Sequence, residues 1–241
     1  MRRRIAGTAR HGRCRPPNLN APTQLLFLPG ASGNPAFWQP LADQLEHPAE
    51  RRFMSYPGFG DAPADPEVEH FEDLVRKVVQ QIDQPTALIA QSMGGVLALR
   101  AALAKPALVT HLVLAVTSGG LDTHALGAQD WREAFVAQHP HLPDWFVTLR
   151  EDLTSELAYV QQPVMLLWGD ADPLSPLSVG EKLLELLPNA ELDVVSNGGH
   201  DLACAHARVL APLVDDFLQA SGDAYDFDDD DDDFDNDNDD A

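Results

Sequence analysis

The stretch Thr86-Ala87-Leu88-Ile89-Ala90-Gln91-Ser92-Met93-Gly94-Gly95-Val96-Leu97-Ala98-Leu99 decides the fold of this chain. Its apolar run over 86–90 predicts a buried strand, and the small-residue pattern from Gly94 onward predicts a helix. Ser92 stands at the junction, with Ala90 and Gly94 two positions to either side. Only small residues fit there if the turn is tight, and such a turn exposes the serine Oγ near a helix N-terminus. The stretch predicts a nucleophilic serine, although Ala90 replaces the usual first glycine. A helix N-cap serine is the alternative.

Short apolar runs alternate with helical patterns on both sides of this stretch. Near-continuous apolar runs of this kind are typical of parallel strands that are buried on both faces. We therefore predict an α/β fold of three layers, with a mostly parallel sheet of about six strands and helices on both faces. The predicted strands are 24–28, 51–56, 86–90, 111–116, 163–168 and 190–195, and the predicted helices are 37–45, 71–82, 179–187 and 208–218.

The two ends of the chain differ in composition from its body. Residues 1–22 are rich in Arg and Pro, and residues 221–241 are dominated by Asp. We predict that both segments are disordered, that the first holds no strand, and that the folded domain covers 23–220. Residues 16–222 contain 26 acidic and 10 basic residues, which argues against nucleic-acid binding because phosphates need Lys and Arg to neutralise them.

Compartment and cofactors leave weak traces in the sequence. There is no apolar run long enough to span a membrane, and no apolar segment follows the arginines at the N-terminus. The two cysteines, Cys14 and Cys204, make no disulfide framework, so we expect a cytoplasmic protein. No metal-ligand spacing and no dinucleotide or phosphate loop is present, so we predict neither metal nor cofactor. The oligomeric state stays open.

One connection is too long for a single crossover helix. The 46 residues between Val116 and Pro163 predict a small helical cap, over about 118–160, above the carboxyl ends of the strands. Ligands bind at that edge in open α/β sheets. Four aromatic residues of the cap are therefore candidate substrate-binding residues, with anchoring of the cap to the body as the alternative: Trp131, Phe135, Trp145 and Phe146.

A serine hydroxyl needs a base, and the base needs an orienting carboxylate. The fifth predicted strand runs into Asp170 and Asp172, and the sixth runs into Gly199-His200. The chain order is thus Ser, Asp, His, and either aspartate is a candidate for the acid. His111 and His206 follow no glycines at a strand end, so we expect surface or helix positions for them.

These landmarks together resemble the α/β-hydrolase fold superfamily over nearly all of 23–220. The matching segments are Leu28-Pro29-Gly30-Ala31, Tyr56-Pro57-Gly58-Phe59-Gly60, the Ser92 turn, Gly169-x-x-Asp172-Pro173 and Gly199-His200. The resemblance implies Ser92 as nucleophile, His200 as base and Asp172 as acid, because the family acid usually takes the fourth position of the Gly-x-x-Asp turn. It also implies an oxyanion hole built from the backbone N–H groups of Ala31 and Met93.

The resemblance implies a serine hydrolase that acts on a small-molecule acyl substrate, an ester or thioester, through an acyl-enzyme. Amidase chemistry, carbon–carbon bond hydrolysis or lysis, and a non-catalytic binding role remain alternatives. The chain departs from the family in two places. Many relatives have His-Gly where this chain has Pro29-Gly30, and most have an antiparallel strand pair before the first parallel strand, for which residues 1–22 give no indication.

Overall fold

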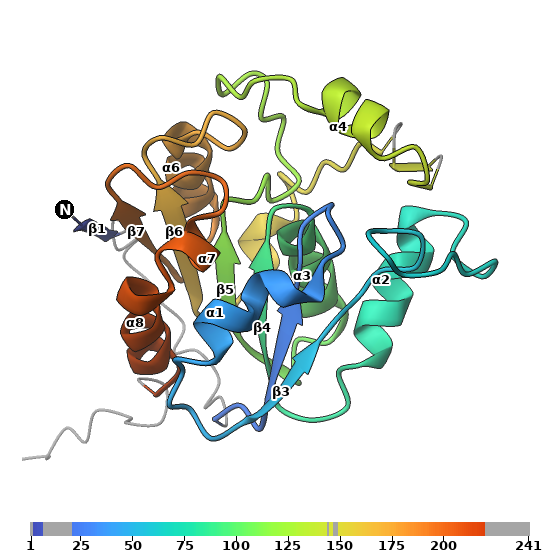
Figure 1. The fold of residues 1–241 in the computed structure, drawn as a ribbon. Helices are drawn as coiled ribbons and strands as arrows, with labels where there is room; N and C mark the ends of the chain where they lie inside the picture. Colours follow the sequence, from blue (N-terminus) through green and yellow to red (C-terminus); the bar gives the residue numbers. More distant parts are fainter. Residues whose placement is uncertain (1, 7–20, 144, 147–148, 220–241) are drawn as a thin grey trace, which may run out of the picture.

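The computed structural model describes residues 2–6, 21–143, 145–146 and 149–219. Seven strands form one sheet in the order β1-β7-β6-β5-β4-β2-β3, and helices cover both of its faces (Figure 1). The α/β prediction is confirmed. The strands are β1 (Arg2–Ala6), β2 (Gln24–Leu28), β3 (Glu50–Phe53), β4 (Thr86–Gln91), β5 (Val109–Ala115), β6 (Val164–Gly169) and β7 (Ala190–Val195).

The helices divide between the two faces of the sheet. One face carries α1 (Gln39–Ala42), α7 (Leu202–Ala205) and α8 (Ala207–Gln219), which contact one another. The other face carries α2 (Phe71–Gln80), α3 (Met93–Ala104) and α6 (Leu177–Leu186). In the long connection, α4 (Arg132–Gln138) lies above the carboxyl ends of the strands (Figure 1). The connection over about 118–160 is called the cap below. Short 3-10 turns occur at Pro35–Trp38 and Leu157–Tyr159.

The seventh strand corrects the prediction for the N-terminal segment. Strands β2 to β7 are all parallel, whereas β1 pairs antiparallel with β7, from Arg2 opposite Val195 to Ala6 opposite Glu191. The expectation of no strand in 1–22 is therefore wrong for Arg2–Ala6. β1 adds to the free edge of β7, and Arg4 forms an ion pair with Glu191 across the pairing. The sequence of β1 has no apolar pattern that would have predicted a strand. Residues 7–20 and 220–241 lie outside the described residues, so the disorder predicted there stays a prediction.

The core lies between the sheet and its two helical layers. Every residue of β2, β4, β5 and β6 is buried. The buried face of α2 consists of Phe71, Leu74, Val75 and Val78. His111 is a second correction, because it is fully buried in β5 and its ring packs edge-on against Phe217. Burial lowers the pKa of His111 to about 4, with the nearby His47 as a smaller cause.

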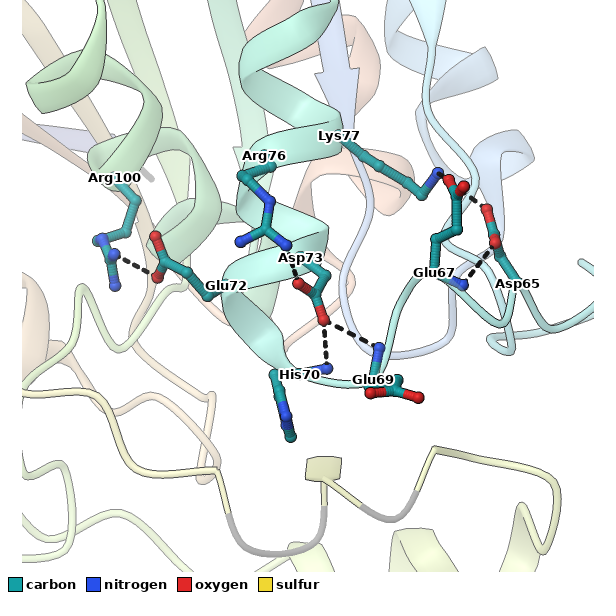
Figure 2. A network of polar contacts seen from close by, with 9 residues as sticks. All are labelled: Asp65, Glu67, Glu69, His70, Glu72, Asp73, Arg76, Lys77 and Arg100. Carbon is teal, nitrogen blue, oxygen red and sulfur yellow. Dashed lines mark hydrogen bonds and ion pairs between the residues drawn. The ribbon is translucent and has the colours of Figure 1, made fainter.

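A polar network ties the cap to the helix that follows Ser92. Arg100 on α3 bonds Glu72 at the start of α2 and Glu151 in the cap's return segment, the second at 2.7 Å. The start of α2 is capped by Asp73, whose Oδ2 accepts from the backbone N–H groups of Glu69 and His70 (Figure 2). Through Arg100, the segment that returns from the cap is fastened to the body of the protein.

Within the described ranges, no helix is both long and apolar enough to cross a bilayer.

Candidate active site

Ser92 occupies a backbone conformation that only a tight turn requires. Its φ is +53° and its ψ is −120°, an uncommon combination for a residue with a side chain. Neighbouring strands and loops hold it there. The Ser92 N–H donates to the Ala115 carbonyl at 3.0 Å, and the Ser92 carbonyl accepts from Thr117 Oγ1 at 2.6 Å. Ser92 stands at the N-cap position of α3, but its side chain makes no capping hydrogen bond there. The Ser92 hydroxyl therefore does not cap α3, which was the alternative to a nucleophilic role.

The predicted steric constraint is visible at Gly94. A Cβ at this position would lie 2.5 Å from the Pro29 carbonyl oxygen and 2.6 Å from that of Leu28. At Gly30 in the facing loop, a Cβ would lie 2.3 Å from Gln91 Oε1, the end of a side chain, and 3.1 Å from Ser92 Cβ. Ala90, in contrast, is buried within β4, where its methyl group is accommodated. The turn therefore needs glycine after the serine and tolerates alanine before it.

Asp172 and His200 form a direct pair at the ends of β6 and β7. Asp172 Oδ2 lies 2.7 Å from His200 Nδ1, and the aspartate side chain is fully buried whereas that of the histidine is 28% exposed. The other oxygen, Oδ1, accepts from the backbone N–H groups of Leu174 at 2.8 Å and Ser175 at 3.2 Å. Both carboxyl oxygens of Asp172 therefore have hydrogen-bond partners that fix the orientation of the side chain. A neutral imidazole whose Nδ1–H donates to a carboxylate has Nε2 as its acceptor, which is the arrangement that a general base needs.

Asp170 has a different task. Its Oδ1 accepts from the backbone N–H of Asn197 at 2.6 Å, and Asn197 has a φ of +59°. A second bond runs from the Ala171 N–H to the Gly198 carbonyl at 3.1 Å. The two loops touch so closely that a Cβ at Gly169 would lie 2.1 Å from the Gly198 oxygen. Asp170 thus fastens the loop after β6 to the loop that carries His200, and the structure brings Asp172 to the histidine.

The loop after β2 is held by side chains from two other segments. Trp38 Nε1 donates to the Leu28 carbonyl at 3.0 Å, and the Tyr56 hydroxyl donates to the Pro29 carbonyl at 2.9 Å. Complete burial raises the pKa of Tyr56 well above its usual range, so the hydroxyl stays a donor. These bonds fix the backbone leading to Ala31, while Met93 opens α3 directly after Ser92. Of the two residues predicted for the oxyanion hole, Met93 thus directly follows Ser92, and Ala31 lies in the loop after β2 and lines the same pocket as Ser92.

Ser92 and His200 border two adjoining pockets beneath the cap. The larger lobe has a volume of about 540 Å³ and the smaller lobe about 220 Å³. Trp131 borders both lobes, Phe146 the larger and Phe135 the smaller. Three of the four predicted aromatic residues thus line the same pockets as Ser92 and His200.

Trp145, the fourth aromatic residue, borders neither lobe. Its ring packs against Phe59 and Phe71, with centroid distances of 5.6 and 6.0 Å. Both partners belong to the body of the protein. This placement favours the alternative of an anchor between the cap and the body.

Sequence reasoning missed several residues around the site. Gln91 Nε2 donates to the His200 carbonyl at 3.2 Å, and Ser175 Oγ donates to the Thr117 carbonyl at 3.3 Å. Two arginines of the cap, Arg132 and Arg150, border the larger lobe. No spacing pattern could have revealed the two hydrogen bonds, because each joins segments far apart in the chain. In the part of the chain that the structure describes, no three His, Cys, Asp or Glu side chains gather to hold a metal ion.

Comparison with known proteins decides the family. A model of the alpha/beta hydrolase family matches residues 25–128, and a model described as TAP-like protein matches residues 133–225. The chain belongs to the α/β-hydrolase superfamily. The fold agrees: this α/β hydrolase superposes on a lipase-esterase related protein from Clostridium acetobutylicum with a TM-score of 0.63 and 19% identity, over 90% of this chain and 99% of that one.

Two relatives in sequence are named for hydrolytic reactions. Over 81% of this chain and 95% of its own length, a pimeloyl-[acyl-carrier protein] methyl ester esterase of Legionella pneumophila is 22% identical. A 2-hydroxy-6-oxononadienedioate/2-hydroxy-6-oxononatrienedioate hydrolase of Pseudomonas putida is 36% identical over 90 residues, which is 35% of this chain and 32% of that enzyme. The second match therefore spans about a third of each protein.

Proposed function

We propose that this α/β hydrolase is a serine hydrolase that cleaves a carboxylic ester or thioester through an acyl-enzyme. The observation that carries the proposal is the 2.7 Å contact between Asp172 and His200, at the rim of a cavity that Ser92 also borders. A buried carboxylate that holds Nδ1–H gives the imidazole its basic form, and a strained turn presents the serine to the same space.

The proposed reaction assigns one role to each group. Ser92 Oγ attacks the acyl carbon while His200 takes its proton, and Asp172 stabilises the resulting imidazolium. The carbonyl oxygen, now negative, is bound by the N–H groups of Ala31 and Met93. The imidazolium then gives its proton to the departing alcohol or thiol. Water, deprotonated by the same histidine, releases the acid from the acyl-enzyme and restores Ser92.

The relatives favour an ester as substrate. The Legionella protein, which matches over most of both chains, is named for methyl ester hydrolysis. The Pseudomonas enzyme is named as a hydrolase of 2-hydroxy-6-oxononadienedioate, a compound without an ester bond. Hydrolysis of a carbon–carbon bond is therefore our second candidate. Its support is narrower because that match covers 35% of this chain.

Labelling with a fluorophosphonate probe tests the proposal. The probe should modify wild-type protein and Ser155→Ala, an exposed serine outside the cavity, but not Ser92→Ala. Hydrolysis of p-nitrophenyl esters and acyl thioesters should show the same pattern. Wild-type protein that neither labels nor hydrolyses any of these substrates would overturn the proposal. Ser92-dependent cleavage of a 6-oxo dienoate, without ester hydrolysis, would establish the second candidate instead.

A further inference from the structure

Arg132 places a half-buried cation in the larger lobe of the cavity. It is the first residue of α4, and its guanidinium carbon lies 5.1 Å from the Phe146 ring centroid and 5.4 Å from that of Trp131. Among the described residues, its side chain has one hydrogen-bond acceptor, the Phe146 carbonyl, and no carboxylate partner. A guanidinium carries five N–H donors, so this one acceptor leaves several of them without a partner among the described residues.

A second cation reinforces the first. Arg150 borders the same lobe and uses one of its N–H groups for the neighbouring Leu149 carbonyl. The pKa of Arg132 is lowered, chiefly by burial and then by the charge of Arg150, and Asp130 opposes this shift only as the smallest cause. The positive charge of Arg132 is therefore incompletely balanced by its surroundings, and a bound anion would stabilise it.

Among the described residues, none of the acidic side chains around the lobe forms an ion pair with Arg132 or Arg150. Glu151 is engaged by Arg100, which also bonds Glu72 (Figure 2). The other carboxylates of the lobe are exposed and accept backbone N–H groups in their own turns; they are Asp122, Asp130 and Asp152. The one partly buried carboxylate of the lobe, Glu151, thus forms its ion pair with Arg100 and not with Arg132.

We infer that the substrate carries a carboxylate on the part that fills the larger lobe, and that Arg132, assisted by Arg150, binds this group. This inference rests on the proposed function, because it places the scissile carbonyl at Ser92, where the two lobes meet. A guanidinium recognises a carboxylate by two parallel hydrogen bonds. The smaller lobe is bordered by Phe37, Trp131, Phe135 and Leu174 and takes the uncharged portion.

Matched pairs of substrates test the inference. On the acyl side, mono-p-nitrophenyl glutarate is compared with the uncharged p-nitrophenyl pentanoate. On the alcohol side, 4-butyryloxybenzoate is compared with its methyl ester. The readout is the ratio of kcat/KM for the charged and uncharged members, so a general loss of catalytic power cancels. Arg208→Gln, an exposed arginine on α8 away from the cavity, serves as the control of equal charge change.

In one of the two pairs, Arg132→Gln should lower this ratio about 10- to 100-fold, the range for a hydrogen bond to a charged group. Arg150→Gln should lower it less, and Arg208→Gln should leave it unchanged. A ratio that Arg132→Gln leaves unchanged in both pairs would overturn the inference while ester hydrolysis, and with it the proposed function, still stands. Absence of hydrolysis of every ester would instead remove the proposed function.

Inhibition of the wild-type enzyme gives a second test that needs no variant to fold. Glutarate should inhibit hydrolysis of p-nitrophenyl pentanoate competitively, with a Ki about tenfold or more below that of the uncharged glutaramide. Equal inhibition by the two compounds would contradict an arginine-bound carboxylate.

Discussion

Replacing Asp172 with Asn would keep the size of the side chain but remove its charge. In the native site, Oδ1 is held by the Leu174 and Ser175 N–H groups at 2.8 and 3.2 Å. The oxygen of the amide should take this position, because an NH₂ group there would face two donors. The amide NH₂ would then face His200 Nδ1, at the position where Oδ2 now lies 2.7 Å away.

This arrangement would force the wrong tautomer on His200. Nδ1 would become an acceptor, the proton would move to Nε2, and the imidazole could not take the proton of Ser92. The expected loss in kcat is about 10⁴-fold, which corresponds to about 5.4 kcal/mol of transition-state stabilisation. The fold should survive because both backbone hydrogen bonds to Oδ1 remain.

Asp170→Asn is the matched control. The amide oxygen can still accept from the Asn197 N–H, so the loops after β6 and β7 stay joined and kcat should change about twofold or less. The assay is steady-state hydrolysis of p-nitrophenyl butyrate by both variants, with thermal unfolding recorded alongside. If Asp170→Asn lost more activity than Asp172→Asn, with both proteins folded, the assignment of the acid would be refuted.

The remaining predictions concern stability. His111 has a pKa of about 4 in the folded protein, below its ordinary value of 6.5, so the unfolded chain binds the proton more tightly. Its stabilisation is complete above about pH 6.5 and falls with decreasing pH, by about 2 kcal/mol between about pH 7.5 and pH 5. Measured by urea, the free energy of unfolding should depend less on pH in His111→Gln than in wild type or in the exposed control His141→Gln. The same pH dependence in His111→Gln as in wild type would contradict this prediction. Gly94→Ala should lower the free energy of unfolding by about 1–3 kcal/mol because its methyl group meets backbone at 2.5 Å, whereas Gly199→Ala, with its nearest contact at 3.4 Å, should not; equal Tm values for both would refute the steric argument.

The positions of the candidate catalytic residues followed from the sequence for a physical reason. Parallel strands end at the same edge of a sheet, so residues that follow three such strands must lie near one another. Apolar runs locate the strand ends at Ser92, Asp172 and His200 without knowledge of the side-chain contacts. The chain order alone left Asp170 and Asp172 open, because both lie in one turn, and only the resemblance favoured Asp172. The structure brings Asp172 to His200 and Asp170 to the Asn197 backbone.

Other features depend on contacts that local pattern does not record. Strand β1 pairs with an edge left open by β7, and its arginines gave no apolar alternation from which a strand could be predicted. His111 was expected at a surface or on a helix, although it lies within an apolar run. His111 is buried because helices cover both faces of β5, and every residue of such a strand is buried whatever its polarity.

The proposed carboxylate site has no pattern in the sequence, whereas the proposed hydrolytic chemistry has one. Arg132 and Arg150 belong to a connection without a regular period, and the return of that connection toward the body is fastened by the bond from Arg100 to Glu151. Arg100 lies on α3, the helix that begins directly after Ser92, yet its side chain contacts the cap and α2, not the reacting groups. The sheet and the turn therefore hold Ser92, Asp172 and His200, whereas the cap sets the lining of the larger lobe. Substitutions of the cap arginines should accordingly change which ester is cleaved before they change whether an ester is cleaved.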